Sequence, residues 1–355
     1  MDEKLIPVIV TAVAGGIIGE QVLKCLRFAE RYIIIGTDTT NFSKGLYEVD
    51  YPEIVPPASS PDYIDTLLYL CNRYRALVCI PGSEPELKAM SKNRKFFKDA
   101  GVFLPINSEQ VLDTCLNKLK TISFLKENGF SYPETINIKP DTDVKVVDFF
   151  PVIIKPLKDA GGSKNVYIAQ DLEELKYYSN ESFKKNNEVL VQQYIGTYDD
   201  EYTIGVLSSM NGEIINSIGI HRNIITGLGN KLKVENKTKY KDLGDYLVVS
   251  SGITQGKIGV FRPVCQQCED IANSIKSCGP LNVQCRFVND KVFVFEINPR
   301  FSGSSPFRAL VGFNEVDILI MQTLFNKLVE RYFKYNTGYA MRGLNEIFVQ
   351  DLVGA

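Results

Sequence analysis

The sequence has no long hydrophobic run and no excess of charge of either sign. No apolar stretch approaches the length of a membrane-spanning helix, so we expect no membrane-embedded segment. The 40 Lys and Arg residues nearly balance the 42 Asp and Glu residues, giving a net charge of −2. This balance provides no electrostatic attraction to nucleic acid or to an acidic membrane surface, and any phosphate binding must be local.

Histidine is almost absent, since His221 is the only one in the chain. A lone histidine near a strand end is usually a surface or packing residue, so we assign His221 no catalytic role. The eight cysteines are scattered, mostly within apolar runs, as is typical of reduced, buried thiols. Cys265 and Cys268 have metal or redox spacing on a predicted helix, but a closed zinc site needs four ligands. A zinc or redox site there is the less favoured alternative.

The length of 355 residues suffices for two or three subdomains of ordinary globular composition. The start at Met1 lacks the order of charged and apolar residues that marks a secretory signal, so we expect a cytoplasmic protein. Apolar runs over residues 6–13, 32–36 and 76–80 alternate with helical patterns. This alternation predicts a parallel sheet with crossover helices.

The first strand ends in a glycine-rich turn, Ala14-Gly-Gly-Ile-Ile-Gly19. One interpretation is a dinucleotide site, but the turn lacks the full Gly-x-Gly-x-x-Gly pattern. The alternative is that these glycines permit close packing of a helix on a strand. We favour the packing role over NAD binding.

Two alternating apolar runs flank Asn289-Asp290 and predict a β-hairpin. With a three-residue loop, Gln284 lies opposite Glu296, and Asn298 shares their face. A two-residue loop would separate the faces. Oxygen ligands of this kind suit magnesium or manganese, and Arg300 just past the strand can reach a phosphate. The alternative is an exposed hairpin face that is polar by chance.

The run from Gln284 through Glu296-Ile-Asn-Pro-Arg300 resembles the metal-binding end of ATP-grasp ligases, in particular those similar to the large subunit of carbamoyl-phosphate synthase. The resemblance covers nearly the whole chain and implies a combined α/β and α+β fold. It implies an N-terminal parallel-sheet, pre-ATP-grasp (Rossmann-like) domain followed by a two-lobed ATP-grasp fold. The expected parts are residues 1–110, a small lobe with the lid over 111–195, and a large lobe with the metal site over 196–355.

The resemblance also implies residues that contact ATP. Lys118 matches the lysine that opens the nucleotide-binding region, and Lys155 matches the lysine that contacts the α- and β-phosphates. Gly161, Gly162 and Ser163 match a flexible flap over the triphosphate, because glycine lets main-chain amides approach anionic oxygens. Read alone, each lysine is a solvated surface residue and the loop an ordinary turn.

The segment Gln192-Gln193-Tyr194-Ile195 resembles the hinge that contacts the adenine edge through main-chain groups. Gln192 stands where the family often has glutamate, and its amide can still accept a hydrogen bond. Glu201 matches the acid that accepts ribose hydroxyls, the alternative being an exposed acid at a strand start.

The acceptor side is less defined. Arg222 matches a basic residue that faces a carboxylate or phosphate, for which bidentate arginine is suited. The run Ser302-Gly-Ser-Ser305 and Arg308 are candidates to line the same pocket, and Ser304 or Ser305 could instead cap a helix before Pro306.

The resemblance implies a ligase that uses ATP and Mg²⁺ or Mn²⁺ to phosphorylate a substrate carboxylate and then attach an amine. Arg300 and Arg222 are the expected catalytic residues, with Gln284, Glu296 and Asn298 as metal ligands. The expected partners are small-molecule carboxylates and amines, and the oligomeric state stays open between monomer and homo-oligomer.

Alternative functions are a carbamoyl-phosphate-synthase-like or carboxylase-like subunit, a nucleotide-binding protein without turnover, and an NAD-dependent oxidoreductase. A full carbamoyl-phosphate synthase is disfavoured because no internal repeat is visible, and a biotin carboxylase because no carrier segment is present.

Overall fold

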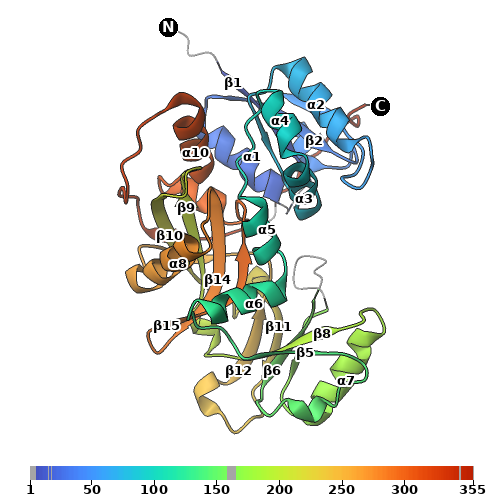
Figure 1. The fold of residues 1–355 in the computed structure, drawn as a ribbon, viewed down its shortest axis with the longest axis vertical. Helices are drawn as coiled ribbons and strands as arrows, with labels where there is room; N and C mark the ends of the chain where they lie inside the picture. Colours follow the sequence, from blue (N-terminus) through green and yellow to red (C-terminus); the bar gives the residue numbers. More distant parts are fainter. Residues whose placement is uncertain (1–4, 15, 17, 158–164, 344, 355) are drawn as a thin grey trace.

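A computed structural model describes residues 5–14, 16, 18–157, 165–343 and 345–354. The molecule is elongated, with the N-terminal sheet at one end, a long antiparallel sheet in the middle and a smaller sheet at the other end (Figure 1). The combined α/β and α+β fold that we expected is therefore confirmed.

The N-terminal sheet has the strand order β3-β2-β1-β4, and all its pairings are parallel. Its strands are fully buried at positions such as Val8, Ile34 and Ile80, because crossover helices cover both faces. The elements are β1 (Ile6–Thr11), α1 (Ile18–Ala29), β2 (Tyr32–Asp38), β3 (Tyr51–Ile54), α2 (Tyr63–Tyr74), β4 (Val78–Ile80), α3 (Glu84–Lys92) and α4 (Arg94–Asp99), with a short 3-10 turn at η1 (Lys44–Tyr47).

Two short helices, α5 (Glu109–Cys115) and α6 (Lys118–Glu127), lead out of this sheet. The side chain of Asn117 accepts hydrogen bonds from the main-chain amides of Leu119 and Lys120, so it caps α6. Lys118 is consequently the first residue of α6, which fixes its position at the edge of the next lobe.

The small sheet has the order β5-β8-β6-β7, with antiparallel pairings and a helix packed on one face. A separate hairpin, β11-β12, packs against it through a cluster that contains Ile168, Tyr194 and Leu247. The elements are β5 (Thr135–Ile138), η2 (Val144–Val146), β6 (Val152–Pro156), β7 (Tyr167–Ala169), α7 (Leu172–Phe183), β8 (Val189–Gln193), η4 (Gly227–Gly229), β11 (Asn230–Glu235), η5 (Lys241–Leu243) and β12 (Tyr246–Ser250).

The central sheet has six strands in the order β15-β14-β9-β10-β13-β16. Its last strand, β16, belongs to the C-terminal part of the chain and pairs with β13. The elements are η3 (Tyr198–Asp200), β9 (Glu201–Ser208), β10 (Ile214–Arg222), β13 (Gly256–Gly259), α8 (Arg262–Ser274), β14 (Pro280–Val288), β15 (Lys291–Asn298), α9 (Ser305–Leu310), α10 (Glu315–Phe325) and β16 (Gly338–Ala340).

The predicted hairpin is β14-β15, but the expected three-residue loop is wrong. The loop has two residues, Asn289 and Asp290, with φ angles of 50° and 60°. Both angles suit the tight hairpin turn that Asn and Asp favour. The register then shifts by one residue between the Cys285↔Val294 pair and the Gln284↔Glu296 pair. This β-bulge inserts Phe295 and restores the pairing that a two-residue loop would otherwise destroy.

The Cys265 and Cys268 side chains lie on α8 and are buried in an apolar cluster with Cys285. Burial raises the pKa of Cys265 to about 11, so its thiol stays protonated near neutral pH. Within the described ranges, no group of three or more His, Cys, Asp and Glu side chains could hold a metal ion. The two thiols therefore serve as packing residues of α8.

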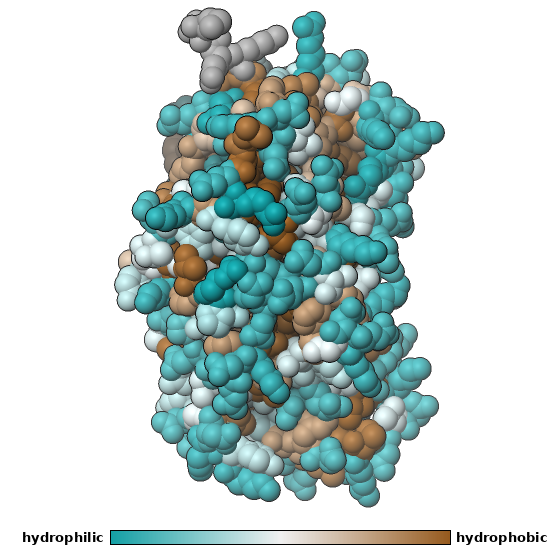
Figure 2. All heavy atoms as spheres, turned by 60° about the vertical axis from the view of Figure 1, so that its left-hand side comes forward, coloured by the Kyte–Doolittle hydropathy of each residue, from teal (hydrophilic) through white to brown (hydrophobic). Residues whose placement is uncertain are grey.

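The outer surface is mixed in character. On the face in Figure 2, hydrophobic residues form small groups between hydrophilic ones. Among the described residues, no helix is both long enough and apolar enough to cross a membrane.

Candidate active site

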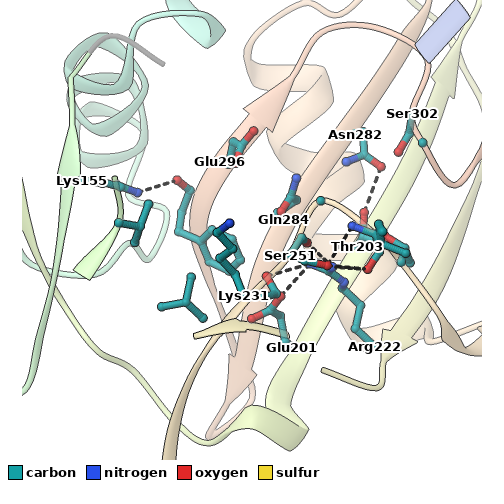
Figure 3. A pocket seen from close by; sticks show the side chains of 18 of the residues that line it. Lys155, Glu201, Thr203, Arg222, Lys231, Ser251, Asn282, Gln284, Glu296 and Ser302 are labelled. Carbon is teal, nitrogen blue, oxygen red and sulfur yellow. Dashed lines mark hydrogen bonds and ion pairs between the residues drawn. The ribbon is translucent and has the colours of Figure 1, made fainter. Parts of the chain in front are cut away.

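A cleft of ≈ 840 Å³ lies where the three sheets approach one another. Its volume is in the range of small-molecule sites. Figure 3 shows Lys155 on one side of it and Gln284, Glu296 and Asn282 on the opposite wall. The predicted site residues that line the cleft are Lys118, Lys155, Gln192, Gln193, Tyr194, Ile195, Glu201, Arg222, Gln284, Glu296, Arg300 and Ser302.

The oxygen-bearing wall comes from paired positions of β14 and β15. Gln284 lies opposite Glu296, and Asn282 lies opposite Asn298. Asn298 is buried and does not itself line the cleft, but it lies next to Glu296: its Nδ2 donates to Glu296 Oε1 at 2.8 Å and its Oδ1 accepts from Arg300 Nη2 at 2.8 Å. An amide oxygen has two lone pairs, so Asn298 Oδ1 keeps one. One carboxylate and two amide oxygens are a donor set that fits a hard divalent cation such as Mg²⁺.

The two predicted lysines reach the cleft from different elements. Lys155, on β6, donates from Nζ to Gln192 Oε1 at 2.9 Å and to the main-chain oxygen of Phe295 at 3.5 Å. Lys118, at the start of α6, donates from Nζ to the main-chain oxygen of Pro156 at 3.2 Å. The expected flap residues Gly161, Gly162 and Ser163 lie outside the described residues.

The hinge segment holds its neighbours together as well as lining the cleft. Gln192 is buried, and its Nε2 donates to Thr135 Oγ1 at 2.9 Å while its Oε1 accepts from Lys155. The amide of Gln193 donates to Glu134 and that of Tyr194 to Pro151, at 2.8 and 3.0 Å. Gln192 therefore positions the lysine, and the two amides are already used within the protein.

Apolar side chains form the walls beside the hinge. Ile153 comes from the small sheet, Phe293 and Phe295 come from the central sheet, and Val248 comes from the β11-β12 hairpin. A slot between such walls suits a flat aromatic ring, with polar main-chain groups at its edge.

Glu201 is 2% exposed and lies between two arginines. Its Oε1 accepts from Arg222 Nη1 at 2.7 Å, and its Oε2 lies 3.5 Å from Arg286 Nη2. Glu201 is therefore not an exposed strand-start acid. Arg222 also donates to Ser250 Oγ and to the main-chain oxygen of Ser251, at 3.0 and 2.8 Å. Its guanidinium is thus held against Glu201 and the end of β12.

Sequence reasoning missed Arg286. It donates to the main-chain oxygen of Ile195 at 2.9 Å and lies 4.3 Å from the ring centre of Tyr194. Burial works to lower the pKa of Arg286, but Tyr194 and Glu201 raise it above its usual value. The period of two along β14 was a usable signal, because Arg286 follows Gln284 on the same face. Other residues that the sequence did not indicate are Glu84, Thr203, Lys231, Ser251 and Asn282, all on the cleft wall.

Arg300 connects the hairpin to the N-terminal sheet. Its Nη2 lies 3.9 Å from Glu84 Oε1 at the start of α3, and its Nη1 donates to the main-chain oxygen of Phe301 at 3.1 Å. Burial lowers the pKa of Arg300, although Glu84 and Glu296 raise it. A cation whose charge is only partly compensated in this way would be stabilised by an anion in the cleft.

The remaining acceptor-side candidates separate in the structure. Ser302 lines the cleft, whereas Ser305 and Arg308 are buried beneath it and bond to Glu315. The expectation that Ser305 and Arg308 face the pocket is therefore wrong. Ser304 is the N-cap of α9, with Pro306 in the first turn.

Gly16 and Ile18 of the glycine turn line the cleft, and other glycines nearby serve packing. A Cβ on Gly82 would lie 1.8 Å from the main-chain oxygen of Thr11, and one on Gly19 would lie 2.1 Å from that of Ala12. These glycines permit close packing of α1 and of the β4-α3 turn on β1, as the packing interpretation requires. His221 lies elsewhere, stacked on Tyr202 at 4.7 Å between ring centres, with Nε2 bonded to the main-chain oxygen of Asp199.

Two family models match the chain. Residues 16–105 match a PylC-like, N-terminal domain, and residues 115–304 match an ATP-grasp domain. The second match covers more than half of the chain and contains Lys118, Lys155, Glu201, Glu296 and Arg300.

Curated relatives share parts of the sequence. The chain is 24% identical over 216 residues to the carbamoyl phosphate synthase large chain of Campylobacter jejuni, which covers 56% of this chain and 17% of that protein. It is 30% identical over 156 residues to the D-alanine–D-alanine ligase of Petrotoga mobilis, covering 42% of this chain and 46% of the relative. The chain therefore spans only a small fraction of the synthase large chain.

A solved structure shares the fold over almost the whole chain. The biotin carboxylase domain of the Hydrogenobacter thermophilus 2-oxoglutarate carboxylase, a dimer in complex with MgADP, ADP and bicarbonate, superposes with a TM-score of 0.65. The two are 15% identical, and the match covers 94% of this chain and 73% of that one.

Proposed function

Because this chain belongs to the ATP-grasp family, we propose that it is an ATP-dependent ligase that joins a carboxylate to an amine through an acyl-phosphate. One observation carries the proposal. The hairpin pairs Gln284 with Glu296 on the wall of the same cleft that Lys155 enters from the opposite sheet. Phosphoryl transfer needs neutralisation of phosphate charge and alignment of the reacting groups rather than a protein nucleophile. A lysine facing a set of metal-binding oxygens across one cleft could provide both.

ATP would lie along the cleft, with its base between the apolar walls next to the hinge. The ribose would lie near Glu201, whose carboxylate the two arginines keep in a fixed orientation. The phosphates would lie near Lys118, Lys155 and Lys231, all of which line the cleft. Lysine ammonium groups at these places would neutralise the triphosphate.

Gln284, Glu296 and Asn298 would hold Mg²⁺ or Mn²⁺. When bound, the metal would neutralise charge on the phosphate oxygens. Arg300 keeps Asn298 Oδ1 in place through their 2.8 Å hydrogen bond, so it acts on this site even without touching the nucleotide.

In the first step, a carboxylate oxygen of the substrate attacks the γ-phosphorus of ATP. A new P–O bond forms as the bond to the β-phosphate oxygen breaks, and ADP leaves with the electron pair. In the second step, an amine attacks the acyl carbon and phosphate leaves. The chain's task is to hold the reacting groups in line and to limit access of water.

We infer that the substrates are small molecules of the amino-acid type. The D-alanine–D-alanine ligase relative and the PylC-like N-terminal match support this inference. We also propose the three parts 1–110, 111–195 and 196–355 as its domains. The carbamoyl phosphate synthase matches favour a carbamoyl-phosphate-synthase-like or carboxylase-like subunit that uses bicarbonate as the second candidate.

The test is to screen MgATP with pairs of amino acids and with bicarbonate alone, measuring release of ADP. With an accepted carboxylate labelled with ¹⁸O, one label should appear in the released phosphate, because the carboxylate oxygen leaves with the phosphoryl group. Formation of AMP, or unlabelled phosphate during confirmed product formation, would exclude the acyl-phosphate route. ADP release with bicarbonate but with no amino-acid pair would favour the second candidate.

A further inference from the structure

A buried ion pair joins α9 to the start of α10, packed against strands β9 and β14 of the central sheet. Arg308 Nη1 is 3.1 and 3.0 Å from the two carboxylate oxygens of Glu315, and both residues are 1% exposed. Removing two charges from water costs free energy, so an ion pair buried this deeply need not stabilise the fold, and a role other than stability is worth seeking. Gly205 on β9 makes room for it, because a Cβ there would lie 2.2 Å from Arg308 Nη1.

The arginine of this pair continues to the cleft wall. Arg308 Nη2 donates to Asn282 Oδ1 at 2.5 Å, and Thr203 Oγ1 donates to the same oxygen at 3.0 Å. A guanidinium has no acceptor, so the amide atom that faces it must be the oxygen. The Asn282 amide is thereby prevented from flipping.

The amide nitrogen of Asn282, Nδ2, therefore faces the cleft. Asn282 lines the cleft, and in the described part of the chain its Nδ2 has no protein hydrogen-bond partner. Figure 3 shows the nitrogen of Asn282 directed away from Thr203, toward the side on which Gln284 and Glu296 lie. Asn282 also pairs in register with Asn298. A donor of fixed orientation thus stands beside the place where the carboxylate and phosphate would meet.

We propose that Asn282 is a catalytic hydrogen-bond donor and that Arg308 and Glu315 are the positioning residues that aim it. The proposal rests on the ligase function proposed above. When the amine nitrogen attacks the acyl carbon, the C=O π pair moves onto oxygen, and Asn282 Nδ2–H donates to this oxyanion. The pair then returns to re-form C=O, phosphate leaves with the electrons of the C–O bond, and the amine proton passes to solvent. A preorganised donor is most effective where charge develops.

The experiment uses the full chain and the amino-acid pair that gives the fastest ADP release with wild type. Asn282→Ala should lower kcat by about 10²-fold, the effect of one lost oxyanion donor. KM for ATP and the affinity for MgADP should stay within about twofold, since the donor acts only on the reacting oxygen. Arg308→Lys keeps the positive charge but lacks the planar fork, so it should lower kcat by about tenfold.

The double variant separates positioning from general damage. If Arg308 acts through Asn282, Arg308→Lys should have almost no further effect on kcat in the Asn282→Ala background. Glu269→Gln is the matched control, because Glu269 is an equally buried acid that does not line the cleft. Its Oε1 lies 3.2 Å from Arg262 Nη1. This variant should lower the melting temperature and leave kcat near wild type.

An Asn282→Ala variant with kcat within about threefold of wild type would overturn the donor role. Additive losses in the double variant would overturn the positioning role of Arg308. Wild-type protein that binds MgATP but releases no ADP with any amino-acid pair would instead overturn the proposed ligase function, which distinguishes the two failures.

Discussion

The glycine turn after β1 and the β14-β15 hairpin both border the cleft, but they contribute different things to it. Around the turn, Gly19 and Gly82 bring main chains so close that no side chain fits between them. Along the hairpin, Gln284 and Glu296 present amide and carboxylate oxygens at paired positions. The glycines thus serve packing, and the hairpin side chains carry the candidate chemistry.

The difference shows that a glycine-rich turn after a strand is weak evidence of a nucleotide site. Asp38 at the end of β2 accepts from the amides of Ala14 and Thr39, at 2.9 and 2.8 Å. Asp38 therefore bonds to Ala14, the first residue of the turn. The conjunction of Lys155, Glu296 and Arg300 on one cleft is more informative, because two segments far apart in the chain, β6 and the end of β15, meet there.

The largest expected effect is at the hairpin. Glu296→Ala should reduce turnover by about 10³-fold or more, because it removes the one carboxylate of the proposed metal site. The fold should persist, since Glu296 is only partly buried. ADP release and the melting temperature measure the two effects. Glu127→Ala, at an exposed residue of α6, is the control. Magnesium-dependent turnover near the wild-type rate in the Glu296 variant would remove the hairpin from the mechanism.

The next effect concerns the glycine side and should appear in stability. Gly82→Ala places a Cβ 1.8 Å from the Thr11 main-chain oxygen, so the β4-α3 turn must move. We expect a loss of about 1–3 kcal/mol in the free energy of unfolding, measured by denaturant titration. Gly338→Ala, where no atom lies within 4 Å of the added Cβ, should cost much less. Equal losses in both variants would contradict the packing role of Gly82.

Stabilisation by added nucleotide compares the hairpin side of the cleft, where we propose that ATP binds, with the glycine turn, where NAD would bind. MgATP at about 100 times its dissociation constant should add about 2.7 kcal/mol of stability by mass action, and NAD should add none. Thermal unfolding with each nucleotide measures this. A shift with NAD and none with MgATP would assign nucleotide binding to the glycine turn instead of the cleft.

The smallest expected effect is at His221. Because its ring packs on Tyr202 and bonds to a main-chain oxygen, His221→Gln should change kcat by less than about twofold and leave the pH profile of turnover unchanged. The pH profile is the sharper measurement. Loss of a limb near the usual histidine pKa would show that His221 takes part in proton transfer.

Local patterns predicted much of the architecture. The runs that became β1, β2 and β4 are continuously apolar because both faces of a parallel sheet are covered. The hairpin was predicted from its alternation and from Asn289-Asp290, but its loop length was not. The loop is one residue shorter than predicted, and the bulge at Phe295 adds one residue to β15. The two differences cancel, so the predicted pairing of Gln284 with Glu296 is right although the predicted loop length is wrong.

The sequence by itself determined the parallel N-terminal sheet, the hairpin and the residue types of the cleft, because periodicity and turn chemistry act over a few neighbouring positions. Only the tertiary structure decided that Arg222 and Arg286 both face Glu201, and that Arg308 lies beneath Asn282 rather than in the cleft. Such contacts join residues far apart in the chain. A buried charge must find its partner wherever the packed elements place one, and no local pattern records that partner.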